Sequence, residues 1–305
     1  MRTVCLAVIV VVLGMAWPRA AAQEAAPQAV FRSGVNMVSM AAIVRDAKGR
    51  VVSTLTQKDF EVLDGGQRRP LLDLRTEDAA PASVALLVDG SGSMKASAAS
   101  DAALRVSNAV LSSLDPLRDD AALFSFDTRL LTIRPFTHDI AEVGRALDEV
   151  RSWGSTSLYD AIAGTAAIVA ARTANRRAIV VLTDGADTTS AYTPTRVAEI
   201  ASAVDAPVYA VVWDSRTPES RSVEENVRLG SLRGLAEMTG GELFVVGDDV
   251  VMARAIRKIL EELRHQYVLA FEAAPHGGWR SVRVQTRQRG LTVRTRAWYL
   301  AGSGD

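Results

Sequence analysis

The stretch ASVALLVDGSGSM, residues 82–94, decides how this chain folds. Its first half is a continuous run of aliphatic and β-branched residues, which is typical of a parallel strand buried on both faces. Asp89 follows this run directly, and two glycines then allow a sharp turn that carries Ser91 and Ser93. Because ligands of open α/β sheets bind beyond the carboxyl ends of the strands, this turn is a candidate binding loop.

Two further loops carry oxygen donors of the same kind. The run AIVVLT, residues 178–183, ends at Asp184, and the loop GSTSLYD carries Thr156. The complete set of candidate ligands is Asp89, Ser91, Ser93, Thr156 and Asp184. Two carboxylates and three hydroxyls are hard donors, so the set favours Mg²⁺, Mn²⁺ or Ca²⁺ over zinc or copper. Such a set would leave a coordination position for an oxygen atom of a partner.

The order Asp-x-Ser-x-Ser, threonine loop and Thr-Asp-Gly turn resembles the metal-ion-dependent adhesion site of von Willebrand factor A domains. The resemblance implies that one divalent cation, which binds an acidic side chain of a protein partner, is coordinated by Asp89, Ser91, Ser93, Thr156 and Asp184. None of these positions departs from the motif. The alternative is that they are ordinary turn residues, because Gly, Ser and Asp prefer turns for local hydrogen-bonding reasons. Three segments in this order favour the metal site.

Strands and helices alternate across residues 81–265, the predicted von Willebrand factor A domain. The alternation predicts an α/β fold with a doubly wound, mostly parallel, six-stranded Rossmann-like sheet. The predicted strands are 83–88, 121–126, 130–136, 178–183, 207–213 and 242–246, and the predicted helices are 98–114, 140–151, 158–171, 229–238 and 250–265. Only three residues separate the second strand from the third, so these two form a hairpin and the third is an antiparallel edge.

The flanking residues 30–80 and 266–300 contain short alternating apolar stretches and glycine turns, which are typical of small antiparallel units. Isolated hairpins are marginal, so we predict that the two ends pair into one small β-sandwich. The alternative is that each end packs separately on the α/β domain. Both ends also resemble a bacterial family of exported proteins with a von Willebrand factor A-related domain. That family often has a Gly-Tyr pair near its end, where this chain has Trp298 and Tyr299.

Residues 1–22 have the pattern of a secretory signal peptide. Arg2 precedes an apolar run at 4–17, and three alanines stand before Gln23 as a small-residue cleavage site. The run is shorter than the roughly 20 residues that a membrane-spanning helix needs, which disfavours a membrane anchor. We therefore expect an exported protein, periplasmic or secreted, with no membrane insertion after cleavage.

The charge balance excludes some partners. Cleavage would remove Arg2 and Arg19 from the 35 basic residues and leave 33 of them against 35 acidic ones. A nearly neutral protein gives no electrostatic reason to bind nucleic acid or an anionic membrane. The one cysteine, Cys5, lies in the signal peptide, so no disulfide or thiol chemistry is expected in the mature chain.

Enzymatic functions need residues that this sequence does not have. A phosphatase of the haloacid-dehalogenase type would need a second aspartate two residues after Asp89, and Ser91 stands there. The motifs HExxH, GxSxG and GxxxxGK[ST] are absent from the sequence. We therefore predict a non-enzymatic module that binds a protein partner through a divalent cation. The alternatives are a structural subunit of an envelope complex with a purely stabilising metal and, remotely, a Mg²⁺-dependent phosphatase.

Overall fold

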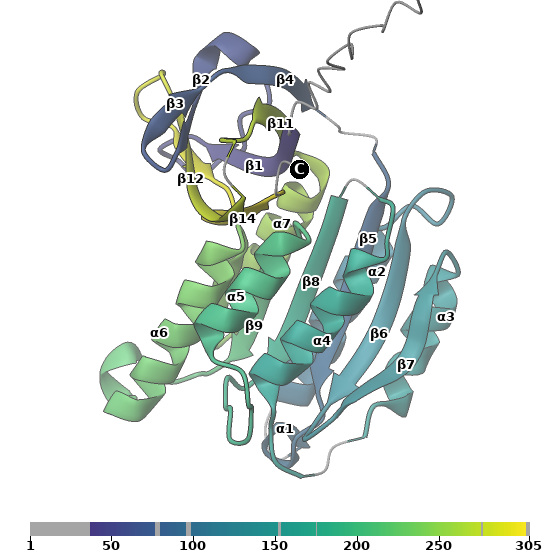
Figure 1. Cartoon of the computed structure of the whole chain (residues 1–305). Coiled ribbons are helices and arrows are strands. Elements are labelled where there is room, and N and C mark those ends of the chain that lie inside the picture. Colours follow the sequence, from purple (N-terminus) through teal and green to yellow (C-terminus); the bar gives the residue numbers. More distant parts are fainter. Residues whose placement is uncertain are drawn as a thin grey trace, which may run out of the picture. The chain divides into compact units, whose positions relative to one another are not determined.

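The computed structural model describes residues 37–76, 80–95, 99–151, 154–174, 176–275 and 277–302. The predicted signal peptide, residues 1–22, lies outside the described residues. Within them, the middle of the chain forms an α/β part, and strands from both flanks form a separate β part (Figure 1).

The α/β part contains a six-stranded sheet with the order β10-β9-β8-β5-β6-β7. Its strands are β5 (Ala82–Asp89), β6 (Asp120–Phe126), β7 (Leu130–Thr137), β8 (Arg176–Thr183), β9 (Val208–Trp213) and β10 (Glu242–Val246). All neighbouring pairs are parallel except β6 and β7, which form an antiparallel hairpin. The predicted mostly parallel sheet with an antiparallel edge is confirmed.

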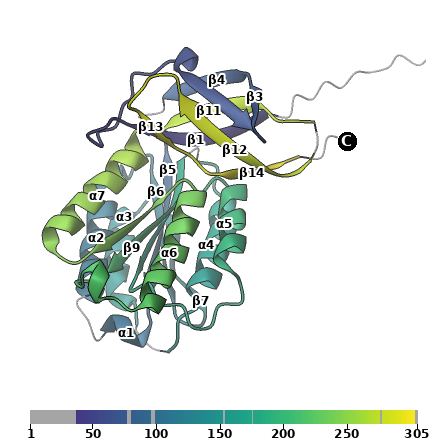
Figure 2. The ribbon, with the colours of Figure 1, turned by 90° about the vertical axis from the view of Figure 1, so that its left-hand side faces the viewer.

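Helices cover both faces of this sheet, which confirms the doubly wound arrangement. They are α1 (Gly92–Lys95), α2 (Ala99–Ser113), α3 (Ile140–Arg145), α4 (Leu158–Ala170), α5 (Pro194–Ala203), α6 (Val223–Met238) and α7 (Asp249–Arg264). Figure 2 shows α2, α3 and α7 on one side of the strands and α4 and α5 on the other. None of the helices in the described part of the chain is long and apolar enough to cross a bilayer.

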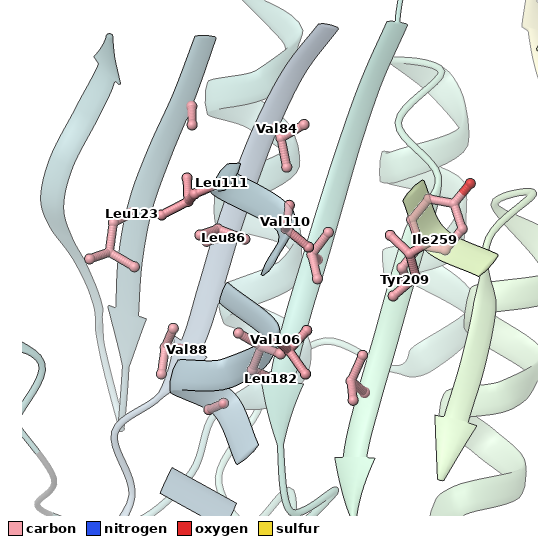
Figure 3. Close-up of a cluster of buried hydrophobic side chains, with 14 of the residues drawn as sticks. Val84, Leu86, Val88, Val106, Val110, Leu111, Leu123, Leu182, Tyr209 and Ile259 are labelled. Carbon is pink, nitrogen blue, oxygen red and sulfur yellow. The ribbon is translucent and has the colours of Figure 1, made fainter. Parts of the chain in front are cut away.

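Each face of the sheet has its own hydrophobic core. Every residue of β5 is buried, as expected for a continuous apolar run between two helical layers. On one face, Leu86 and Val88 of β5 belong to the same cluster as Val106 and Val110 of α2 (Figure 3). This packing fixes the direction in which β5 delivers Asp89 to the end of the sheet.

The helices after β8 differ from the sequence prediction. Helix α5 was not predicted, although Thr193 caps it by accepting a hydrogen bond from the backbone of Arg196, and Pro194 stands at its first turn. Helix α6 begins at Val223 rather than at the predicted residue 229. The helix predicted at 140–151 is shorter, because α3 ends at Arg145 and a 3-10 turn, Ala146–Glu149, follows.

The β part consists of two four-stranded sheets, with the orders β13-β1-β11-β4 and β14-β12-β2-β3. Its strands are β1 (Met37–Arg45), β2 (Phe60–Asp64), β3 (Gln67–Arg69), β4 (Leu71–Thr76), β11 (Tyr267–Glu272), β12 (Gly278–Thr286), β13 (Thr292–Arg294) and β14 (Trp298–Ala301). Each sheet contains strands from both flanks, and apolar side chains of both sheets share one core. The predicted β-sandwich from the two ends is confirmed.

A buried carboxylate joins the β part to the α/β part. Glu262 of α7 has no exposed surface, and it forms ion pairs with Arg45 of β1, at 2.9 Å, and with Arg294 of β13. Arg294 also pairs with Glu242 of β10. Burial, with the charge of Glu262 as a smaller cause, raises the pKa of Tyr209 well above its usual value. Acidic side chains of the α/β part thus pair with arginines of the β part where the two parts meet.

Candidate metal centre

Asp89 lies at the carboxyl end of β5 and is buried, with 1% of its surface exposed. Its Oδ1 accepts a hydrogen bond of 2.8 Å from the backbone N–H of Ser91, and its Oδ2 accepts one of 2.6 Å from Thr183 Oγ1. Thr183 is the last residue of β8, and its Oγ1 in turn accepts from the backbone N–H of Gly185. These bonds connect the ends of the two neighbouring strands and fix the Asp89 carboxylate.

The Asp89 loop then turns sharply toward α1. Ser91 Oγ and Ser93 Oγ lie 3.0 Å apart; Ser91 is buried, whereas Ser93 is exposed. The turn requires a glycine at position 90, because a Cβ atom there would lie 2.7 Å from the carbonyl oxygen of Arg151 and 2.8 Å from Ser125 Oγ. The loop therefore packs closely against the segments of the same chain that carry Ser125 and Arg151.

The backbone of Thr156 is hydrogen-bonded to the loop that follows β8. Its carbonyl oxygen accepts from the N–H groups of Thr188, at 2.8 Å, and Thr189, at 3.1 Å, and its own N–H donates to Thr188 Oγ1 at 2.9 Å. The N–H of Gly92 donates to the carbonyl oxygen of Gly154, which connects the Thr156 loop to the Asp89 loop. The three predicted loops thus form one hydrogen-bonded group.

Asp184 follows β8 directly and is partly exposed. Its Oδ1 accepts from the backbone N–H of Ala186 at 2.9 Å, and Gly185 supplies the positive φ of 81° that the turn needs. Burial, opposed by its hydrogen bonds and assisted by the charge of Asp184, raises the pKa of Asp89 to about 6. Because β5 and β8 are parallel neighbours, the two carboxylates lie at the same edge of the sheet.

The α/β part has relatives among known proteins. The von Willebrand factor type A domain family matches residues 84–186 of the chain. The chain contains a von Willebrand factor type A domain. The matched residues include β5 from Val84 onward, the Asp89 loop, the Thr156 loop and Asp184. No curated protein matches the chain by sequence.

The fold of this chain is similar to that of solved proteins. A von Willebrand factor type A protein from Catenulispora acidiphila is 11% identical, with a TM-score of 0.50 over 89% of this chain and 74% of that chain. Proximal thread matrix protein 1 from the mussel byssus is 15% identical, with a TM-score of 0.50 over 66% of this chain and 51% of its own. The conserved hypothetical protein BatB from Bacteroides thetaiotaomicron is 17% identical, with a TM-score of 0.48 over 59% of this chain and 98% of that chain.

The residues of the von Willebrand factor type A domain fit a hard divalent cation in their chemistry. Within the described ranges, neither Asp89 nor Asp184 forms a salt bridge, and three hydroxyls stand in the same loops. No group of three or more His, Cys, Asp or Glu side chains in those ranges could hold a metal. The donor set is thus rich in hydroxyls and poor in charge, which suits Mg²⁺ or Ca²⁺ rather than zinc.

Three threonines that position the candidate ligands were not assigned that role from the sequence. Thr183, Thr188 and Thr189 orient Asp89 and Thr156, and only the prevalence of threonine around the Asp184 turn could have indicated them. Asp187 accepts hydrogen bonds from the N–H of Leu158, at 2.9 Å, and from Ser190 Oγ. It therefore caps the first turn of α4 and stabilises the same group of loops.

Proposed function

We propose that the von Willebrand factor type A domain binds one divalent cation, Mg²⁺ or else Mn²⁺ or Ca²⁺, and uses it to hold an acidic side chain of a partner protein. The proposed ligands are Asp89, Ser91, Ser93, Thr156 and Asp184. The observation that carries the proposal is that hydrogen bonds join the Asp89, Thr156 and Asp184 loops into one group, while no described residue forms a salt bridge with Asp89 or Asp184. Two like charges in a partly dry site are unfavourable, and a divalent cation would remove that cost.

The chain's own residues determine what such a site can do. Thr183 and the backbone of Ser91 hold the Asp89 carboxylate in place, while Ser93 and Asp184 are at least partly exposed and so accessible to a partner. When bound, the cation supplies the positive charge that attracts an incoming carboxylate. Because hydroxyls are neutral ligands, the five side chains bring only two negative charges and leave room for a third from the partner.

We propose a binding module rather than an enzyme, acting in the periplasm or outside the cell. The pattern of residues 1–22 supports export, and the von Willebrand factor type A domain supports a role in protein interaction. The five proposed ligands include no histidine or cysteine, and the hydroxyls of Ser91 and Ser93 bond each other rather than a general base. This chemistry supports binding of a partner rather than turnover of a substrate.

The first experiment measures the cation alone. Isothermal titration calorimetry of the purified protein with Mg²⁺ should give saturable binding that Ser91→Ala with Ser93→Ala weakens by about tenfold or more, since two of five ligands are removed. Ser112→Ala, on the exposed side of α2, is the matched control and should leave the affinity unchanged. Equal affinity in the double variant and the control would contradict the assignment of the ligands.

The second experiment addresses the partner. Affinity capture from the native envelope should recover a protein in Mg²⁺ that is lost in EDTA and lost with Asp184→Asn. If capture is insensitive to both changes while EDTA lowers the melting temperature, the metal has a stabilising role only, as in a structural subunit of an envelope complex. Hydrolysis of a phosphate ester that Asp89→Asn abolishes would instead indicate a phosphatase.

A further inference from the structure

A cavity of about 240 Å³ lies between β5, α2 and residues 147–150. Most of its wall is apolar, and the apolar side comprises Val88, Met94, Ala103, Leu104, Leu147 and Val150. An engineered apolar cavity of about 150 Å³ is large enough for benzene. A single-ring molecule therefore fits the volume, and a predominantly apolar wall holds water poorly.

One polar group on this wall has no partner. Ser107 of α2 has no exposed surface, lines the cavity, and its Oγ makes no hydrogen bond. Several other helical hydroxyls bond the carbonyl four residues earlier: Ser112 Oγ donates to Asn108 at 2.7 Å, and Thr165 Oγ1 donates to Ala161 at 2.8 Å. The Ser107 hydroxyl is thus unpaired at the cavity wall. Because a buried unsatisfied hydroxyl destabilises the fold, an occupant that hydrogen-bonds it would be stabilised in the cavity.

Two carboxylates restrict the charge of any occupant. Asp89 and Asp148 also line the cavity, and Asp148 is exposed at its rim. An anion would be repelled by both groups, and a cation would lose its hydration against the mostly apolar wall, so we expect a neutral occupant. The serine hydroxyl can either donate or accept, so a hydroxyl or a carbonyl satisfies it equally well.

We propose that this cavity binds a small, neutral, largely apolar molecule that carries one hydroxyl or carbonyl group, which hydrogen-bonds Ser107 Oγ. Of the five proposed cation ligands, only Asp89 also lines this cavity. Binding is therefore measured in EDTA, so that its failure and the failure of the metal site are independent results.

Three probes of similar size test the proposal by protein-detected NMR titration. Benzyl alcohol should bind saturably, toluene should bind more weakly, and benzoate should not bind. Ser107→Ala should weaken benzyl alcohol by about fivefold, the worth of one net hydrogen bond, and leave toluene unchanged. Ser112→Ala, which alters an exposed hydroxyl of the same helix, is the control and should change neither.

Occlusion of the cavity is the second arm of the test. Ala103→Leu adds bulk to a buried part of the wall and should abolish binding of both neutral probes. Leu104→Trp does the same from an exposed position that tolerates a larger side chain, in case the first variant fails to fold. The proposal is overturned if benzyl alcohol does not bind saturably, if Ser107→Ala binds it as tightly as the wild type, or if both occluded variants still bind it.

Discussion

Replacement of Glu262 by glutamine should destabilise the protein strongly, because it removes the one negative charge shared by two guanidinium groups. The Glu262 side chain is fully buried, whereas the side chains of Arg45 and Arg294 are 12% and 21% exposed. Glutamine keeps the size of the side chain and one acceptor oxygen, but its amide nitrogen replaces the other oxygen, and both oxygens of Glu262 accept hydrogen bonds from arginines. The substitution therefore removes the charge and one acceptor, and it leaves two mostly buried cations with fewer partners.

The structure sets the expected magnitude. Removal of one partner from a buried ion pair costs roughly 3–5 kcal/mol. Arg45 keeps a second contact with Glu261 at 3.2 Å, and Arg294 keeps Glu242, so the lower end, about 3 kcal/mol, applies. At roughly 2 °C per kcal/mol for a domain of this size, the melting temperature should fall by about 6 °C.

Glu261→Gln is the matched control, since Glu261 precedes Glu262 on the same helix and pairs with the same arginine. Its side chain is 49% exposed, so its loss should cost no more than about 1 kcal/mol. Urea unfolding followed by circular dichroism, with thermal melts at the same pH and salt concentration, measures both variants. If Glu262→Gln is no less stable than Glu261→Gln, the buried pair does not hold the two parts together.

Three further predictions concern the loops and helices. Gly90→Ala should weaken Mg²⁺ binding in calorimetry and destabilise the protein by about 1–3 kcal/mol, because the added Cβ would collide with the backbone of Arg151. Gly92→Ala is the control and should do neither, because a Cβ at Gly92 would have no atom within 4 Å. Equal effects of the two substitutions would contradict the loop geometry. Gly234→Ala, on the open side of α6, should raise the free energy of unfolding in urea by about 0.5–1 kcal/mol, and a loss would mean that this face is covered. Asp187→Ala should lower it by about 1 kcal/mol through loss of the α4 cap, and no change would show that the cap is dispensable.

The central sheet could be predicted from the sequence because its inner strands are continuous apolar runs bounded by polar, proline- or glycine-containing turns. Helix α5 could not, since its buried face consists of Val197, two alanines and Ser202, too little apolar contrast to produce a clear helical period. Its start carried a usable signal, a threonine cap followed by Pro194. The start of α6 was missed for a related reason, because its first turns are exposed and polar.

The identities of the five candidate ligands could be read from the sequence, but their mutual arrangement could not. The hydrogen bond from Thr183 to Asp89 joins residues 94 positions apart, and the bonds of Thr188 and Thr189 to Thr156 span more than thirty. Such contacts depend on the strand register and on the packing of α4, neither of which local propensity determines. The net charge likewise gives only the balance of acidic and basic residues, so it could not predict which of them form buried ion pairs between the two parts of the chain.

The sandwich made from both ends of the chain has a consequence for the order in which the protein folds. Met37 of β1 pairs with Glu272 of β11, so this strand has no partner on that side until almost all of the chain has been synthesised or translocated. Pairings of such large sequence separation form late, because loop closure must be overcome before they contribute. The α/β part can form first from its own local units, while β1 lacks both of its strand partners and β2 is paired only with β3. Such open strand edges are prone to aggregation. Truncation of the last strands should therefore harm solubility more than their small size suggests.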